Sequence, residues 1–146
     1  MIDETNLSAE FSWFHQERAE KMIKNLGKRG LQGQYVPDCQ AALDAVMALI
    51  PEGETVGFGD SATLYQVGVL AALQERNRNK IIHPLLSDEE GHQTVSWDER
   101  LHQMRECFFS DVYLTSTNVI TLDGKLVNID GIGNRVAAML FGPKKV

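Results

Sequence analysis

The order of short apolar runs along the chain restricts its possible folds more than any other feature of the sequence. Runs of strand type alternate with longer segments whose apolar residues recur at helical spacing. The expected strands are residues 32–36, 55–59, 80–86 and 111–117, and the expected helices are residues 8–30, 39–50, 60–77, 87–110 and 134–142. Strands that alternate with helices build a mostly parallel sheet with helices on both faces. The sequence therefore predicts an α/β fold.

Two segments near the C-terminal end depart from this alternation. Residues 118–130 contain two apolar runs joined at Asp123-Gly124, which is a strong signal for a β-hairpin. Residues 143–146 follow a glycine that ends the last helix, and they resemble the turn into one more strand. Because the last helix of such a sheet normally returns the chain to a further strand, we expect the C-terminal part of a single domain over residues 1–146 to be missing. A sheet edge exposed in this way favours a homodimer.

Composition and charge exclude several classes of protein. The chain is 43% hydrophobic and 23% charged, as soluble globular proteins are, and its net charge is −6. A general nucleic-acid binder needs a basic face, so no nucleic-acid partner is expected. The N-terminus is acidic and no run approaches the ~18 apolar residues of a membrane span, which predicts a cytoplasmic protein without a membrane partner. After residue 124 basic residues outnumber acidic ones, which suits a small anion (Lys125, Arg135, Lys144 and Lys145, against Asp130).

Helix caps and apolar faces follow from local patterns. Ser8 and Asp38 are the expected caps of the first two helices. The expected apolar faces are Phe11, Phe14, Arg18, Met22 and Leu26 in the first helix, Ala42, Ala45, Val46 and Leu49 in the second, and Trp97, Leu101, Met104 and Phe108 in the fourth. We interpret the last set as core packing.

Cysteine and histidine give few leads. Cys39 and Cys107 are isolated, with no spacing suited to a metal; Cys39 is expected to open a helix and Cys107 to face its packed side. His83 precedes a proline near the end of an expected strand and is a candidate for a ligand-facing position. The other histidines are expected on helix surfaces or, for His92, in an acidic loop (His15, His92 and His102). The sequence predicts no metal site and identifies no cofactor.

The first candidate binding corner follows the expected strand 55–59. Its glycines, Gly57 and Gly59, leave room for close approach of the backbone, and the N–H groups of the next residues open a helix. The hydroxyls of Ser61 and Thr63 add donors, so the corner suits a phosphate or a carboxylate. The alternative is a tight turn in which Asp60 or Ser61 caps the helix. The Asp60 carboxylate would compete with an anion for the same N–H groups.

The second candidate corner opens the last helix. Gly131 and Gly133 allow positive φ, and Asn134 is the expected helix cap. Arg135 lies in the first helical turn, where the helix dipole disfavours a cation, so we expect it to hold an anion. The alternative is a pair between Arg135 and Asp130 or Asp123.

Small polar residues end the expected strand 111–117. Thr115 and Asn118, with the hydroxyls between them, either cap the loop or line the same cleft as the two corners. Because ligands of doubly wound sheets gather at the carboxyl ends of the strands, we expect the loop and both corners to meet there.

Several of these motifs together resemble the LUD domain, a lactate-utilisation family long catalogued as a domain of unknown function. The resemblance runs from about residue 13 to the end and is carried by the stretch 57–64 and by Thr115-Ser116-x-Asn118, Asp123-Gly124, Leu126-Val127-Asn128 and Asp130-Gly131-x-Gly133-Asn134-Arg135. It implies a three-layer α/β/α sandwich of the glucosamine-phosphate isomerase, ribose-phosphate isomerase and CoA-transferase type. Members of the family often carry glycine where this chain has Asp60.

The resemblance implies a subunit or accessory protein of lactate oxidation to pyruvate. Its ligand would be a small anionic metabolite such as lactate, pyruvate or a phosphate-bearing compound, and its partners would be iron–sulfur and oxidoreductase subunits. One alternative is an enzyme of the sugar-phosphate isomerase or CoA-transferase class, which needs a carboxylate base or nucleophile, and Asp123 and Asp130 are the acids best placed for it. The other alternative, a non-catalytic assembly module, is favoured by Asp60.

Overall fold

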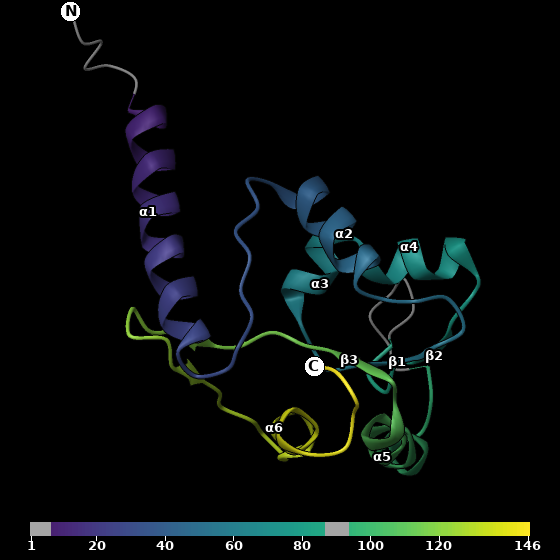
Figure 1. Ribbon diagram of the computed structural model, residues 1–146. Coiled ribbons are helices and arrows are strands. Elements are labelled where there is room, and N and C mark those ends of the chain that lie inside the picture. Colours follow the sequence, from purple (N-terminus) through teal and green to yellow (C-terminus); the bar gives the residue numbers. More distant parts are fainter. Residues whose placement is uncertain (1–6, 87–93) are drawn as a thin grey trace, which may run out of the picture. The chain divides into compact units, whose positions relative to one another are not determined.

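The computed structural model describes residues 7–86 and 94–146 (Figure 1). Contacts within the chain divide it into two compact units. Unit 1 comprises residues 1–37 and 117–128, and unit 2 comprises residues 38–116 and 129–146. Unit 2 contains the parallel sheet that the sequence predicts, and unit 1 contains the hairpin.

The sheet of unit 2 has three parallel strands in the order β2-β1-β3. The strands are β1 (Thr55–Phe58), β2 (Lys80–Ile82) and β3 (Val112–Leu114). In the central strand, Gly57 pairs with Ile82 on one side and with Tyr113 on the other. The tail extends this sheet, because Lys145 forms a parallel bridge with Val112 and its carbonyl accepts the Tyr113 N–H at 2.8 Å. The predictions of a parallel sheet and of strand-like pairing after residue 143 are confirmed.

Helices cover both faces of this sheet. They are α2 (Cys39–Ala48), α3 (Ala62–Val67), α4 (Val69–Arg76), α5 (Trp97–Glu106), the 3₁₀ turn η1 (Cys107–Phe109) and α6 (Asn134–Leu140). Figure 1 shows α2, α3 and α4 on one side of the sheet and α5 and α6 on the other. The core divides accordingly into a cluster around Val56, Phe58 and Leu73 and a cluster around Ile82 and Tyr113. Unit 2 is thus a three-layer α/β/α sandwich, as expected.

Two predicted elements differ in the structure. The single helix expected over residues 60–77 is split into α3 and α4, because Gly68 adopts the left-handed conformation with φ 83° and interrupts the helix. Residues 32–36, expected to form a strand, form none. A strand needs a neighbour for its backbone, whereas Gly33 packs against the side chain of Ile23 in helix α1 (Ser8–Gly27).

The predicted caps and helix faces are confirmed only in part. Asp38 caps α2 by accepting the Ala41 N–H at 2.8 Å. Helix α1 begins at Ser8 itself, with Leu7 in the cap position, so the cap predicted for Ser8 is wrong. The core-facing residues of α2 are Leu43, Val46 and Met47, whereas Leu49 is exposed. In α5 Met104 is buried but Trp97 is half exposed, because this first residue of the helix lies beneath the Arg100 guanidinium rather than in the core.

Unit 1 consists of α1 and a two-stranded hairpin. Strands β4 (Val119–Ile120) and β5 (Leu126–Val127) pair antiparallel, and the turn between them contains Gly124 at φ 79°. A Cβ on Gly124 would lie 2.6 Å from the backbone carbon of Asn25, so the turn packs directly on the end of α1. The hairpin predicted at Asp123-Gly124 is confirmed.

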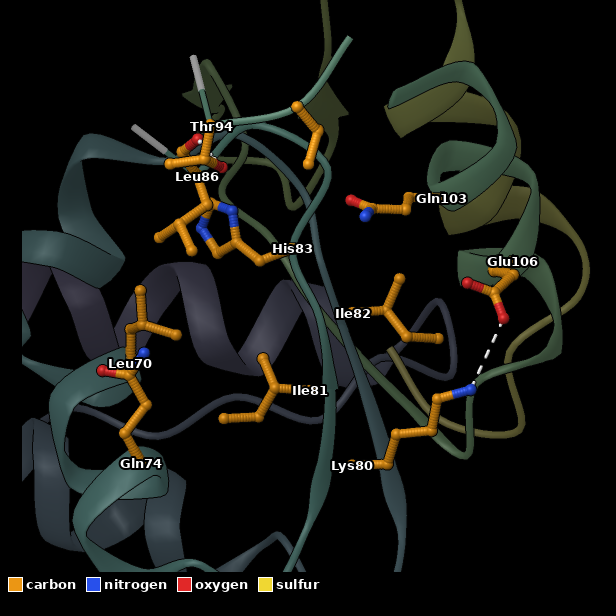
Figure 2. Close-up of a pocket in the computed structure, with 11 residues that line it drawn as sticks. Leu70, Gln74, Lys80, Ile81, Ile82, His83, Leu86, Thr94, Gln103 and Glu106 are labelled. Atoms are coloured by element: carbon orange, nitrogen blue, oxygen red, sulfur yellow. Dashed lines mark hydrogen bonds and ion pairs between the residues drawn. The ribbon is translucent and has the colours of Figure 1, made fainter. Parts of the chain in front are cut away.

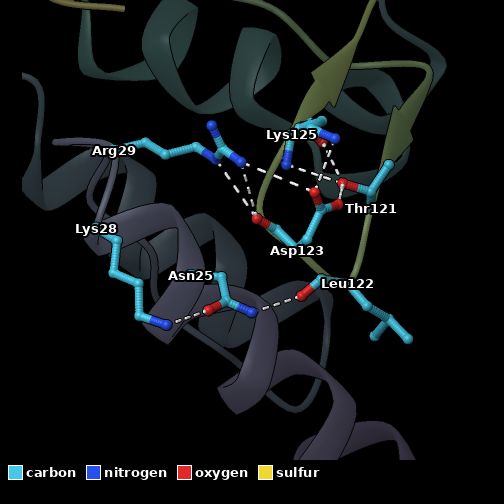
Figure 3. A network of polar contacts seen from close by, with 7 residues as sticks. All are labelled: Asn25, Lys28, Arg29, Thr121, Leu122, Asp123 and Lys125. Atoms are coloured by element: carbon cyan, nitrogen blue, oxygen red, sulfur yellow. Dashed lines mark hydrogen bonds and ion pairs between the residues drawn. The ribbon is translucent and has the colours of Figure 1, made fainter.

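Polar contacts fix this turn to the helix (Figure 3). The Asn25 side chain donates to the Leu122 carbonyl at 2.7 Å. Within the turn, the Asp123 carboxylate accepts the Thr121 hydroxyl at 2.6 Å and lies 2.9 Å from the Lys125 ammonium. These hydrogen bonds, from Thr121 first and then Lys125, lower the pKa of Asp123 to about 2. Asp123 therefore stays ionised and stabilises the turn.

We predict that Gly57 in β1 and Gly59 just after it are required for packing. A Cβ on Gly57 would lie 2.9 Å from the Ser110 hydroxyl, and one on Gly59 would lie 2.7 Å from the Tyr113 hydroxyl. Gly57→Ala and Gly59→Ala should each lower the free energy of unfolding by roughly 1–3 kcal/mol, measured in urea. Gly131→Ala is the matched control, because no heavy atom lies within 4 Å of that Cβ position and its φ is not positive. Equal stability of all three variants would contradict the packing role.

Candidate functional site

The first corner lies at the carboxyl end of β1. Ser61 is buried, and its hydroxyl accepts the Leu64 N–H at 3.2 Å, which caps α3. Asp60 and Thr63 are exposed on either side of this cap. The corner therefore has the form of the tight-turn alternative, with Ser61 as the cap. Thr63 and the first N–H groups of α3 remain at the surface.

The space beside the two glycines of this corner is filled by the protein itself. The α5 side of Gly57 is occupied by Ser110, Tyr113 and Cys107, and that of Gly59 by Tyr113 and Thr115. Neither glycine has a positive φ. Gly57 and Gly59 thus let neighbouring side chains approach β1, and the room expected for a ligand on this side is taken.

The second corner is built around Asp130. Its carboxylate accepts the Val136 N–H at 2.9 Å and caps α6. Gly133 occupies the cap position with φ 86°, whereas Gly131 is exposed and its φ is not positive. Asn134 is the first helical residue, so the cap predicted for it is wrong. The carboxylate of Asp130 reaches the helix N-terminus from outside the helix and takes that place.

Arg135 holds two backbone segments together. Its side chain donates to the Ser116 carbonyl at 2.6 Å and to the Ile129 carbonyl at 2.7 Å. The residue is only 9% exposed. Ser116 lies just beyond the end of β3, so Arg135 fixes the loop after β3 to the segment before α6. Its binding of an anion stays a prediction.

The hydroxyl of Tyr113, a residue that no sequence pattern indicated, lies at the first corner. Tyr113 is 2% exposed, and its hydroxyl lies next to Gly59. Burial is the largest cause that raises the pKa of this hydroxyl, and Cys107 is the next. The negative charge of Asp130 raises this pKa further, and the positive charge of Arg135 lowers it. We call the edge where β1, β2 and β3 end the carboxyl edge.

His83 lies at the same edge, beyond the end of β2. Its ring stacks on Phe58 with 5.1 Å between centroids, and Nε2 is 3.0 Å from the Tyr65 hydroxyl. Burial lowers the pKa of His83, while its own backbone and the charge of Asp60 oppose this. Nδ1 of His83 is buried and has no hydrogen-bond partner among the residues that the structure describes. The position predicted for His83, near a strand end and facing the edge, agrees with this placement.

A cavity of about 310 Å³ runs along the outer side of β2 (Figure 2). Ile81 and Ile82 point to opposite faces of the sheet, and both line it together with His83. Helices α4 and α5 supply further walls through Leu70, Gln74, Gln103 and Glu106, and Leu86, Thr94 and Val95 complete the lining. Lys80 and Glu106 form an ion pair of 3.4 Å at one end. No sequence pattern indicated this cavity, because it forms only when α4, β2 and α5 pack against one another.

The remaining candidates are dispersed. Thr115 lies against Gly59 at the carboxyl edge, whereas Asn118 is an exposed residue of unit 1. Cys39 is exposed and opens α2; Cys107 is buried, which raises its pKa to about 11. His15 and His102 are exposed as predicted, and His92 lies outside the described residues.

The described ranges, 7–86 and 94–146, contain no group of three or more His, Cys, Asp or Glu residues placed to hold a metal ion. No helix within them combines the length and the apolar character needed to cross a bilayer.

Comparison with known proteins identifies one family. The sequence model of the LUD domain matches residues 19–146, which is most of the chain and includes both corners. No curated protein and no solved structure matches the chain.

We predict that Arg135→Lys destabilises the fold. Lysine cannot reach both carbonyls with the planar geometry of the guanidinium, so at least one of these partly buried hydrogen bonds is lost. The free energy of unfolding should fall by roughly 1–3 kcal/mol in urea titration. Arg105→Lys, on the exposed side of α5, is the control and should change it by less than about 0.5 kcal/mol. Equal effects of the two changes would argue against the structural role.

We predict that protonation of His83 lowers stability. Its pKa is below the ordinary 6.5 in the fold, so the unfolded chain binds this proton more tightly than the folded chain does. The stability that the fold gains from keeping His83 neutral is fully present above about pH 6.5. It is lost as the pH falls through that value toward the pKa of His83 in the fold. Urea unfolding at about pH 7 and about pH 5 should show a loss of stability at the lower pH that is smaller in His83→Gln. A loss of the same size in both proteins would exclude His83 as a cause.

Proposed function

The chain belongs to the LUD domain family, and on that premise we propose that it is a lactate-utilisation protein that binds a small anionic metabolite at the carboxyl edge of unit 2. The observation that carries the proposal is the buried Tyr113 hydroxyl beside Gly59, with the Thr115 hydroxyl next to it at the neighbouring strand end. Ligands of doubly wound sheets bind outside the carboxyl ends of the strands, where this hydroxyl lies. The metabolite would be a carboxylate such as lactate or pyruvate.

The groups available to such a ligand are modest in number. The Thr63 hydroxyl is exposed in the first turn of α3, and the Thr115 hydroxyl lies on the neighbouring strand end. Arg135 brings a positive charge to this region, where it donates to the carbonyls of Ser116 and Ile129. In a partly buried place this charge attracts an anion over several ångströms.

The charge of Asp60 predicts the direction in which a substitution at this position changes the affinity for an anion. Its carboxylate is exposed beside the first corner and repels an anion bound there. The exposed acid therefore weakens binding that Thr63 and the helix N–H groups favour. Opposite effects of changes at Asp60 and Thr63 would place the ligand at this corner.

An assembly module is a second candidate, and a specific observation favours it. The space beside Gly57 and Gly59 is filled, and Arg135 serves the fold. The isomerase or transferase alternative has less support, because its candidate acids are engaged: Asp130 caps α6 and Asp123 stabilises the hairpin turn. We propose iron–sulfur and oxidoreductase subunits as partners in either case, on the basis of the family.

We predict opposite effects of two substitutions on the binding of L-lactate and pyruvate. Thr63→Val removes an exposed hydroxyl without changing side-chain shape and should weaken binding by roughly threefold to tenfold. Asp60→Asn removes the repelling charge and should tighten binding by about fivefold. Isothermal titration calorimetry measures both, with glucose as an uncharged control ligand. Absence of binding by the unaltered protein, or binding that neither variant changes, would refute the proposed site.

A further inference from the structure

The N-terminal half of α1 presents apolar side chains that nothing in unit 1 covers. The end of the helix packs under the hairpin, where Leu26 is only 8% exposed. Near its start, Leu7, Phe11 and Phe14 are 46%, 58% and 46% exposed. These residues are four and three positions apart, which is the spacing of a coiled-coil seam. A helix that faces only water does not need such a stripe.

Two hollows follow each other along this stripe. The first, of about 380 Å³, is lined by Leu7, Glu10, Phe11, Trp13 and Phe14. The second, of about 440 Å³, is lined by Phe14, Glu17, Arg18 and Lys21 and by Leu122 of the hairpin. In each hollow four of the lining residues have the positions i, i+3, i+4 and i+7, which is the arrangement of a hole that accepts a side chain of a second helix. The occupant is therefore a helix with the same repeat.

The charges along the stripe select the direction of that helix if it is a second copy of α1. We call Leu7, Phe11, Phe14, Arg18 and Lys21 the α1 seam. A parallel pair would place Arg18 against the partner's Arg18 and Lys21 against the partner's Lys21, which like charges disfavour. An antiparallel pair instead places Phe11 against Phe14 of the partner subunit. It also brings Arg18 close to Glu10 of the partner subunit, at both ends of the contact.

We propose that α1 pairs with α1 of a second copy, antiparallel and through the α1 seam, to form a two-fold symmetric dimer. The surface is self-complementary, as a two-fold axis requires: each copy offers holes, aromatic side chains to fill them, and one charge of each sign for the ends. The inference does not depend on the proposed function, since it concerns unit 1 and the ligand site concerns unit 2.

Sedimentation equilibrium tests the proposal on the whole chain. The unaltered protein should show about twice the 16.3 kDa mass of one chain. The double variant Phe11→Asp/Phe14→Asp should be a monomer, because it places charges within the interface. Phe109→Asp/Phe141→Asp is the matched control: both aromatics belong to unit 2 and are 86% and 87% exposed, and this variant should remain a dimer. Circular dichroism and thermal unfolding check that all variants are folded, as expected for exposed positions.

A charge exchange tests the direction of the pair. Glu10→Arg and Arg18→Glu should each weaken the dimer by roughly tenfold, and the two changes in one chain should restore it, because every contact between positions 10 and 18 then regains opposite charges. A monomer at all concentrations overturns the proposal. A dimer that survives Phe11→Asp/Phe14→Asp does so as well, and a double charge variant weaker than either single one rules out the antiparallel direction.

Discussion

The close approach of β3 to β1 is the constraint on which the rest of unit 2 depends. β1 is the central strand of the sheet, and Gly57 within it and Gly59 just after it leave no side chain on the α5 side. Tyr113 fills that space and brings its hydroxyl to Gly59. A larger residue at either position would push β3 away from β1. The carboxyl edge, with its tyrosine, its loop and its arginine, exists because these two strands lie so close together.

Arg135 shows how one side chain can join two segments that are distant in the sequence. It donates to the carbonyls of Ser116 and Ile129, which lie on either side of the segment that belongs to unit 1, from Thr117 to Asn128. The fold therefore needs the guanidinium for its geometry, and it obtains a positive charge near the carboxyl edge at the same time. Loss of the residue would remove the contact between these two segments, so its first consequence is expected in the stability of the fold.

In unit 1, glycine and the large apolar residues have different roles from those they have in the sheet of unit 2. In the hairpin turn Gly124 provides a positive φ and a close contact with α1, and the surrounding polar network fixes the turn. The α1 seam, in contrast, exposes large aromatic side chains to water. A helix packed along its whole length would have no such surface. The contrast along one helix, covered at one end and bare at the other, is what points to an interface.

The sequence by itself determined what depends on neighbours in the chain. The alternation of apolar runs predicted the α/β class, the Asp123-Gly124 pair predicted the hairpin, and Asp38 was found as a helix cap. The resemblance to the LUD domain, read from the corner motifs, was confirmed by the family match. Each of these signals is local: a turn, a cap or a periodicity is decided within a few residues.

Only the tertiary structure decided how distant segments meet. Whether the room beside Gly59 is left for a ligand or filled by Tyr113 depends on a residue more than fifty positions away. Residues 32–36 have a strand-like pattern, yet a strand requires a partner, and the chain packs this segment on α1 instead. The local sequence predicts Asn134 as the cap of α6, whereas in the structure the Asp130 carboxylate accepts the Val136 N–H at the start of that helix. Long-range packing and hydrogen bonding choose among options that local sequence leaves equally open.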